Sequence, residues 1–133
     1  MALVVLDASI IIGFLDPEDE LRDACVAALV EYQDDDLVVP ASVYAEILVA
    51  PYRRSADAVA EVEAFLSDLV IRVEPITASI ARTGARLRSE WTSLKLPDAL
   101  VLACGDEVEA DVILTGDGSW ETLSKRVTVV RPG

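Results

Sequence analysis

Residues 3–12 read LVVLDASIII, two aliphatic runs with a single charged residue, Asp7, between them. The first run is typical of a buried strand over residues 3–7, and the second is typical of a short helix over residues 8–15. A carboxylate among aliphatic side chains is unfavourable to desolvate unless something compensates it. Asp7 is therefore interpreted either as the N-cap of the helix or as a ligand for a positive group.

The same alternation of short β-branched runs and helical segments continues along the whole chain. The apolar runs are continuous, which is typical of parallel strands buried on both faces. The prolines, Pro51 included, fall near the expected boundaries. The pattern predicts an α/β fold, a three-layer α/β/α sandwich around a mainly parallel sheet of about five strands. Strands are expected at residues 3–7, 37–40, 70–76, 112–117 and 127–132, and helices at residues 8–15, 20–32, 42–50, 55–69, 78–91 and 97–108.

Length and composition favour a single domain over residues 1–133. The chain is 53% hydrophobic and 26% charged, which excludes intrinsic disorder. Its net charge of −13 argues against broad non-specific binding of nucleic acid, since phosphate affinity depends on Lys and Arg. The absence of histidine excludes Ser-His-Asp and Cys-His catalysis and any His-ligated zinc.

The cysteines and the N-terminus indicate the compartment. Cys25 and Cys104 each lie alone in an apolar helical context, which favours buried free thiols in a reducing environment. The N-terminal apolar run has no preceding basic residues, and Asp7 interrupts it, so it does not fit a signal peptide. No run is long enough for a membrane span. We therefore expect a cytoplasmic protein without membrane association.

Four acidic residues fall at joints between strands and helices, where parallel sheets build their sites. Asp7 ends the first strand, Glu46 lies one turn into the helix after the second, Asp98 starts a later helix, and Asp117 follows the fourth strand. Local roles explain three of them: Asp7 as an N-cap, Asp98 as a dipole-favoured acid after a proline, and Asp117 as a turn residue.

Glu46 is harder to explain by local structure. A capping box with Ser42 needs an acid at position 45, which is alanine. Glu46 is also the only charge in a nearly all-apolar segment, and Asp98 is similarly isolated in LPDALVLAC. We therefore expect both acids to lie in otherwise buried segments, where solubility is seldom the reason for a charge.

The four carboxylates are expected to share one rim of the sheet, where they would repel one another without a cation. Mg²⁺ and Mn²⁺ prefer carboxylate and water ligands and need no histidine. Such a site supports metal-assisted hydrolysis of a phosphodiester. Asp111, in contrast, precedes a strand at its amino end, so we expect it to lie away from this site.

With these residues in place, the chain resembles PIN-domain ribonucleases, and among them the VapC-type toxins of bacterial type II toxin–antitoxin pairs. The resemblance covers essentially the whole chain. It rests on four segments in the family's order and roughly its spacing: LDAS (6–9), SVYAEIL (42–48), LPDALVLA (96–103) and LTGDGSW (114–120).

The resemblance implies that Asp7, Glu46, Asp98 and Asp117 form the acidic quartet around Mg²⁺ or Mn²⁺. Asp7 and Asp98 would be direct ligands, and the other two would bind through water, hold a second metal or orient water. Ser9 and Thr115 match hydroxyls that flank the family's site and would support the carboxylates or the attacking water; local capping remains the alternative. Gly116 and Trp120 depart from a longer polar residue and a Phe that are frequent in the family; both changes concern substrate contacts.

The resemblance further implies RNA hydrolysis that leaves 5′-phosphate and 3′-hydroxyl ends. Arg53, Arg54 and Lys95 are candidate RNA contacts because they lie near the expected rim, although a solvated surface explains each equally well. The implied partners are a VapB-like antitoxin, an RNA substrate, operator DNA reached only through the antitoxin, and a second copy of the chain in a homodimer. An acidic protein suits a basic antitoxin segment.

Two alternatives remain open. One is a housekeeping RNA-processing PIN nuclease outside any toxin pair, and the small size of the chain favours the toxin over it. The other is a PIN fold that no longer cuts and that acts as an RNA-binding or protein-binding module. The intact quartet argues against a module of that kind.

Overall fold

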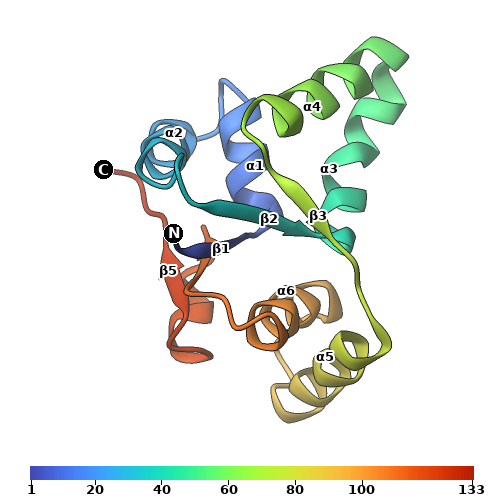
Figure 1. The fold of residues 1–133 in the computed structure, drawn as a ribbon, viewed down its shortest axis with the longest axis vertical. Helices are drawn as coiled ribbons and strands as arrows, with labels where there is room; N and C mark the ends of the chain where they lie inside the picture. The colour runs from blue at the N-terminus through green and yellow to red at the C-terminus, as the bar shows by residue number, and fades with distance from the viewer.

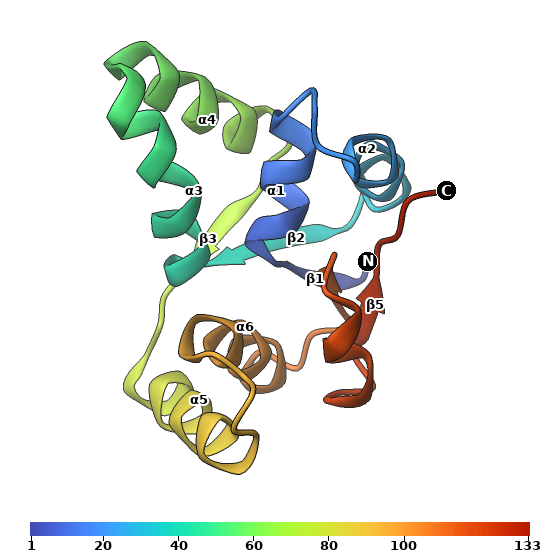
Figure 2. The same cartoon turned by 180° about the vertical axis from the view of Figure 1, so that it is seen from behind.

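The structure, a computed structural model, describes all of residues 1–133. Its centre is a five-stranded, all-parallel sheet with strand order β3-β2-β1-β4-β5. Figures 1 and 2 show α1 to α4 on one face of this sheet and α5 and α6 on the other. The predicted three-layer α/β/α sandwich is therefore confirmed. No helix combines the length and the hydropathy needed to cross a bilayer.

The strands lie close to the ranges predicted from sequence. They are β1 (Leu3–Leu6), β2 (Asp36–Pro40), β3 (Arg72–Glu74), β4 (Val112–Thr115) and β5 (Val127–Val129). The three central strands are buried as predicted, but β3 and β5 are shorter than expected and only partly buried. They are the two edges of the sheet, where one side of the strand has no neighbour, so the expectation of burial on both faces is wrong for them.

Six helices and one short 3₁₀ helix surround the sheet. They are α1 (Ala8–Leu15), α2 (Arg22–Glu31), α3 (Ala41–Arg54), α4 (Ala56–Asp68), α5 (Ala78–Glu90), α6 (Leu96–Glu107) and η1 (Gly118–Thr122). The largest difference from prediction is at Pro51, which lies inside α3 and does not end it. Pro51 is buried with Val43, Ile47 and Leu48, so packing of this face outweighs the lost backbone donor.

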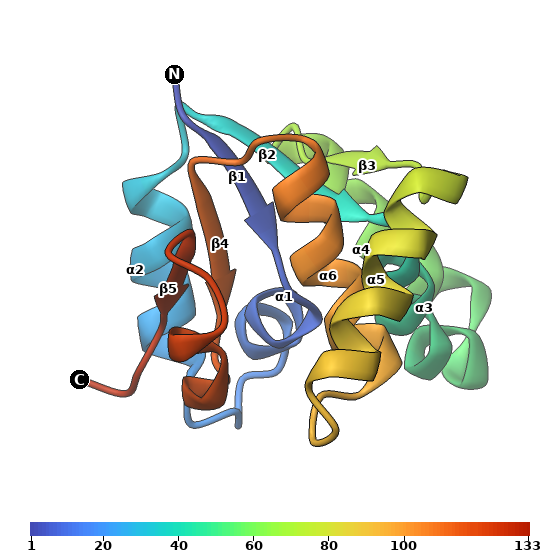
Figure 3. The same cartoon turned by 90° about the horizontal axis from the view of Figure 1, so that it is seen from below.

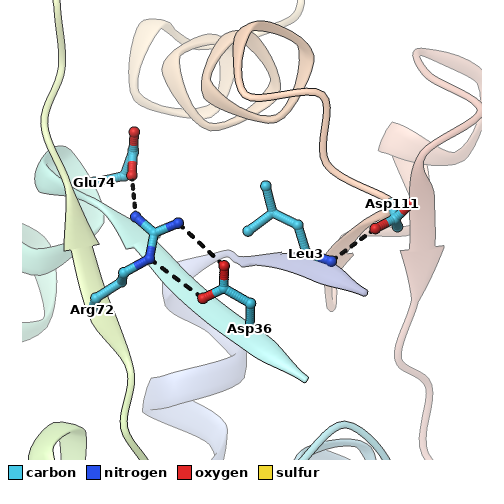
Figure 4. Close-up of polar contacts among 5 residues, drawn as sticks. All are labelled: Leu3, Asp36, Arg72, Glu74 and Asp111. Atoms are coloured by element: carbon cyan, nitrogen blue, oxygen red, sulfur yellow. Dashed lines mark hydrogen bonds and ion pairs between the residues drawn. The ribbon is translucent and has the colours of Figure 1, made fainter. Parts of the chain in front are cut away.

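The start of β1 is held by carboxylates at the amino edge of the sheet. The Leu3 amide donates to Asp111 Oδ2 at 2.8 Å (Figure 4). The Ala2 amide donates to Asp35 Oδ1 at 2.9 Å. Asp111 therefore lies at the opposite end of β1 from Asp7, as the sequence predicted. Figure 4 also shows Arg72 of edge strand β3 between Asp36 and Glu74, an exposed set of ion pairs that links β3 to β2.

Val70 ends α4 in a left-handed conformation, with φ of 54°. A Leu66–Ile71 backbone hydrogen bond of 2.8 Å closes the helix around it, in the pattern that normally has glycine at this position. A β-branched residue is strained there, and the Val70 side chain is 81% exposed, so it gains little from packing.

We expect Val70→Gly to raise the free energy of unfolding by about 0.5–1 kcal/mol, because relief of strain exceeds the added entropy of the unfolded chain. Urea denaturation would measure the change. Val49→Gly in α3, at a half-exposed valine with ordinary helical φ, is the control and should destabilise the protein. A loss of stability in both variants would contradict the strain at Val70.

Candidate metal centre

The candidate site lies at the carboxyl edge of the sheet, where β1 and β4 end side by side (Figure 3). The chain leaves these neighbours in different directions, since β2 and β3 lie beyond β1 and β5 lies beyond β4. This is the position where open parallel sheets place their ligands. Leu6 pairs with Leu114, so the next residues, Asp7 and Thr115, meet at this point.

Asp7 is held by three hydrogen bonds and is only 9% exposed. Its Oδ1 accepts from the Ala8 amide at 2.8 Å, which makes Asp7 the N-cap of α1. Its Oδ2 accepts from the hydroxyls of Ser9 and Thr115, each at 2.8 Å. Asp7 is thus the N-cap of α1, which was one of the two interpretations of the sequence. Capping uses only Oδ1, however, and leaves the role of Oδ2 to be explained.

The two hydroxyls also tie Asp7 to the turn after β4. Ser9 Oγ accepts from the Gly116 amide at 2.9 Å, and Thr115 Oγ1 accepts from the Asp117 amide at 3.1 Å. Each hydroxyl therefore accepts from the backbone and gives its one proton to Asp7 Oδ2. The two hydroxyl protons that point at Oδ2 leave no room for a proton on that oxygen and favour the ionised carboxylate.

The surroundings of Asp7 oppose that ionised state. Burial is the main cause that raises the pKa of its carboxyl above the ordinary value, and the nearby negative charge of Asp117 adds to it. The hydrogen bonds from Ser9, Thr115 and Ala8 lower the pKa but do not fully offset burial. The carboxylate is therefore positioned by its neighbours but lacks a positive partner.

The structure places Glu46 and Asp98 close enough to Asp7 for their charges to interact. The pKa of Glu46 is raised by desolvation and then by Asp7 and Asp98. The pKa of Asp98 is raised by desolvation, Asp7 and Asp117, while Lys95 lowers it. All four predicted acids thus belong to one electrostatic cluster. In this arrangement, however, no three acidic side chains converge on a common ion position.

The expectation of an otherwise buried segment holds for Asp98, which is half-buried at the start of the largely buried helix α6. It is wrong for Glu46, which is exposed. Glu46 occupies the solvent side of α3, whose buried side is formed by Val43, Ile47 and Leu48. Its apolar sequence neighbours alternate between the core and the surface, since α3 also exposes Val49. The Glu46 carboxylate is therefore in contact with solvent, and its charge still interacts with those of Asp7 and Asp98.

Asp117 caps η1 and is held by Ser119, a residue that was not among the predicted site residues. Its Oδ1 accepts from the amide and the hydroxyl of Ser119 at 2.9 and 2.6 Å. The Asp-Gly-Ser sequence signals this local turn. These bonds occupy Oδ1, while no hydrogen bond is made by Asp117 Oδ2, which remains available for a ligand.

The three candidate cations differ in their relation to the site. Lys95 precedes α6, lies near Asp98 and lines a pocket together with Asp98 and Asp117. Arg53 and Arg54 are exposed at the far end of α3, seven and eight residues beyond Glu46. Arg54 lines a separate groove between α1, α3 and α4. Of the three, only Lys95 is placed beside the acids.

Burial of these acids, together with their mutual repulsion, predicts how the metal-free protein responds to pH. Because folding raises these pKa values, the folded state binds more protons than the unfolded chain between the ordinary and the raised values. Stability should therefore increase as pH falls through that window and be lost as pH rises through it. Thermal melts in EDTA at a series of pH values, falling from neutral towards the ordinary carboxyl pKa, would show this trend.

Glu46→Gln should raise the metal-free melting temperature at pH 7 by roughly 1–3 °C, a small change because Glu46 is exposed. It should also flatten the pH dependence. The control is Glu18→Gln, because Glu18 follows the C-terminus of α1 and Asp7 precedes its N-terminus. This variant should change neither the melting temperature nor its pH dependence. A marked fall in stability for Glu46→Gln would show a structural role instead.

Comparisons with known proteins support the fold and identify a family. The model of the PIN domain family matches residues 4–125. No curated protein matches the sequence significantly. Among solved structures, a toxin–antitoxin complex from Klebsiella pneumoniae is similar, with a TM-score of 0.78 at 20% identity over 95% of this chain and 96% of the other.

Two further solved structures share the fold. VapBC2 from Rickettsia felis bound to a promoter DNA fragment gives a TM-score of 0.77 at 13% identity, over 97% of this chain and 98% of the other. VapC20 from Mycobacterium tuberculosis, a toxin that cleaves the sarcin–ricin loop, gives 0.75 at 16% identity, over 91% and 95%. Because the family model spans most of the sequence, this chain belongs to the PIN domain family.

Proposed function

We propose that this chain is a Mg²⁺- or Mn²⁺-dependent endoribonuclease and the toxic component of a type II toxin–antitoxin pair. The observation that carries the proposal is the position of Asp7. It is a buried carboxylate that accepts hydrogen bonds from Ser9 and Thr115 at the junction of β1 and β4, and its charge interacts with the charges of the three other acids.

The donor set suits a hard divalent cation. The site has carboxylates and hydroxyls but no thiol or imidazole, which favours Mg²⁺ or Mn²⁺ over softer metals. Mg²⁺ usually binds through one or two carboxylates and keeps several waters, so it does not need three converging acids. We assign Asp7 and Asp98 as direct ligands and Glu46 and Asp117 as acids that act through water. The ion would lower the pKa of a bound water and stabilise charge on a phosphoryl oxygen.

The residues of the chain have separate tasks in this mechanism. Ser9 and Thr115 fix the rotamer of Asp7, so its free lone pairs keep one direction. Glu46, exposed and with a raised pKa, is suited to orient the attacking water and take its proton. Lys95 reduces the negative charge beside Asp98, where the RNA backbone must approach. These roles would give hydrolysis with 5′-phosphate and 3′-hydroxyl ends.

The partner assignment is supported by a groove that none of the four acids lines. A pocket of about 390 Å³ between α1, α3 and α4 is lined by Ile12, Leu15, Ile47 and Val62 among others. Ile12 and Leu15 are 45% and 38% exposed, and these apolar side chains suit a helix of a VapB-like antitoxin. A basic segment of that partner would be attracted by the net charge of −13.

Several further features belong to the same proposal. Residues 1–133 act as one domain in the cytoplasm, where the buried free thiols of Cys25 and Cys104 stay reduced. The chain forms a homodimer and has no membrane association. It reaches operator DNA only through the antitoxin, since its own charge repels a duplex. VapC20, which cleaves the sarcin–ricin loop, makes a structured RNA loop a suitable first substrate.

The test is cleavage of total RNA and of isolated stem-loops by purified protein. We expect Mn²⁺ or Mg²⁺ to support cleavage, EDTA to abolish it, and excess Mn²⁺ to restore it. Sequencing of the product ends should show 5′-phosphates. Cleavage that persists in EDTA would overturn the metal mechanism, and RNA binding without cleavage at any metal concentration would identify a non-catalytic module. Relief of growth arrest by co-expression of the adjacent reading frame would separate a toxin from a housekeeping nuclease.

A further inference from the structure

A pocket of about 320 Å³ opens directly beside two of the four acids. One wall is the segment of residues 91–95 between α5 and α6, and the other is η1 with the residue after it. Asp98 and Asp117 both line this pocket, so anything bound in it would lie next to the candidate metal centre. The pocket is therefore placed to hold a part of the substrate.

The walls of the pocket combine an aromatic surface with hydrogen-bonding groups. Trp91 is 45% exposed, although most of the few aromatic side chains in this protein are more buried. Lys95 supplies one positive charge on the same wall. Hydroxyl groups come from Ser93, Ser119 and Thr122. An exposed indole, a cation and several hydroxyls are the groups that proteins use to stack on and hydrogen-bond unpaired nucleotides.

The contrast with the groove between α1, α3 and α4 favours a nucleotide over a peptide. That groove has a larger apolar share, and none of the four acids lines it, which suits an amphipathic helix. In the pocket beside Asp98, six of the ten lining residues are polar or charged. It is also of a size that small-ligand sites commonly have. Lys95 is one of only two lysines in the chain, and it lies where a phosphate would have to pass the acids.

We infer that this pocket binds one unpaired nucleotide of the RNA next to the scissile phosphodiester, with its base stacked on Trp91 and its phosphate facing Lys95. The inference rests on the proposed ribonuclease function. The hydroxyls of Ser93, Ser119 and Thr122 then read the base edge or the ribose 2′-hydroxyl. Trp91 is a substrate-positioning residue in this arrangement and selects single-stranded over duplex RNA, because a paired base cannot leave its helix to stack.

The test measures binding apart from cleavage. In an Asp7→Asn background with Mg²⁺ present, a mixed-sequence 12-nucleotide single-stranded RNA should quench tryptophan fluorescence. Trp91→Ala should remove this quenching and weaken binding by roughly 10-fold or more, while Trp91→Phe should stay within about 3-fold. Lys95→Met should weaken binding and lower its salt dependence. Leu96→Ala, a half-exposed neighbour outside the pocket, and Lys125→Met, the other lysine, are matched controls expected to bind like the background.

Kinetics on the wild-type background separate this inference from the proposed function. Trp91→Ala should raise KM for a cleaved stem-loop with little change in kcat. Unchanged RNA affinity and KM in Trp91→Ala would overturn the nucleotide pocket while leaving the nuclease intact. A change of sedimentation in Trp91→Ala without a change in RNA affinity would also overturn it, since Trp91 would then belong to a protein interface. Trp91-dependent binding by a protein that never cleaves RNA would support the pocket and reject the nuclease.

Discussion

Replacing Asp7 by asparagine should reduce Mn²⁺-dependent RNA cleavage by at least about a thousandfold. Asp7 is proposed as a direct metal ligand, and loss of such a ligand removes several kcal/mol of transition-state stabilisation. The substitution keeps the shape of the side chain but removes its charge. It also disturbs the hydrogen bonds, since one of the two terminal atoms becomes an NH₂ donor facing either the Ala8 amide or the Ser9 and Thr115 hydroxyls. Cleavage of a stem-loop under single-turnover conditions would measure the loss.

The matched control for this prediction is Asp111→Asn. Asp111 also accepts a hydrogen bond from a backbone amide next to β1, but at the opposite end of the strand. Its neutralisation should leave cleavage unchanged. Circular dichroism and thermal melts should show that Asp7→Asn is still folded, with a loss of stability of about 1–3 kcal/mol from the unmatched donor. Retained cleavage in folded Asp7→Asn would remove Asp7 from the mechanism.

Trp120→Ala should destabilise the protein by about 3–5 kcal/mol, a large part of the total stability of a domain of this size. Trp120 is 1% exposed and heads the set of fully buried side chains by volume, so its removal leaves a cavity in the main hydrophobic core. Urea denaturation followed by circular dichroism would measure the change. Loss of cleavage should accompany it, because Trp120 belongs to η1, which follows Asp117.

Two further variants test whether the loss of stability comes from the burial of Trp120. Trp120→Phe retains a ring in the core and removes the indole N–H, which is buried without an acceptor, so the cost should be much smaller. Trp91→Ala removes the same number of atoms from a half-exposed position and should leave stability nearly unchanged. Equal destabilisation by the two alanine variants would show that burial of Trp120 is not the determining factor.

The central part of the fold could be predicted because its signals are local. The aliphatic runs of β1, β2 and β4 form strands that are buried on both faces, so their composition alone indicates central strands of a parallel sheet. The limits of β3 and the course of α3 through Pro51 could not be predicted in the same way. They depend on which strand lies at an edge and on how Pro51 packs, and both are properties of the assembled sheet.

The candidate site could also be predicted only in part. The four acids could be selected from their places at strand ends and helix starts, and the structure brings their charges together. The double role of Ser9 and Thr115 could not be worked out, because each hydroxyl bridges residues more than 100 positions apart in the sequence, with separations of 107 and 108. The pocket beside Asp98 was also missed. Its only sequence signal is a tryptophan in a chain that is just 5% aromatic.

The hydrogen bond between Asp7 and Thr115 also has a consequence for the stage of synthesis at which the site can form. Its partners are separated by 108 residues, and β4 is the fourth of five strands to be synthesised. A ribosome-bound chain that ends before β4 holds Asp7 without either Thr115 or Asp117. Long-range pairings of this kind form late, after most of the chain is available. On the proposed function, we therefore expect a nascent chain to be inactive toward RNA until β4 and the turn after it have been synthesised.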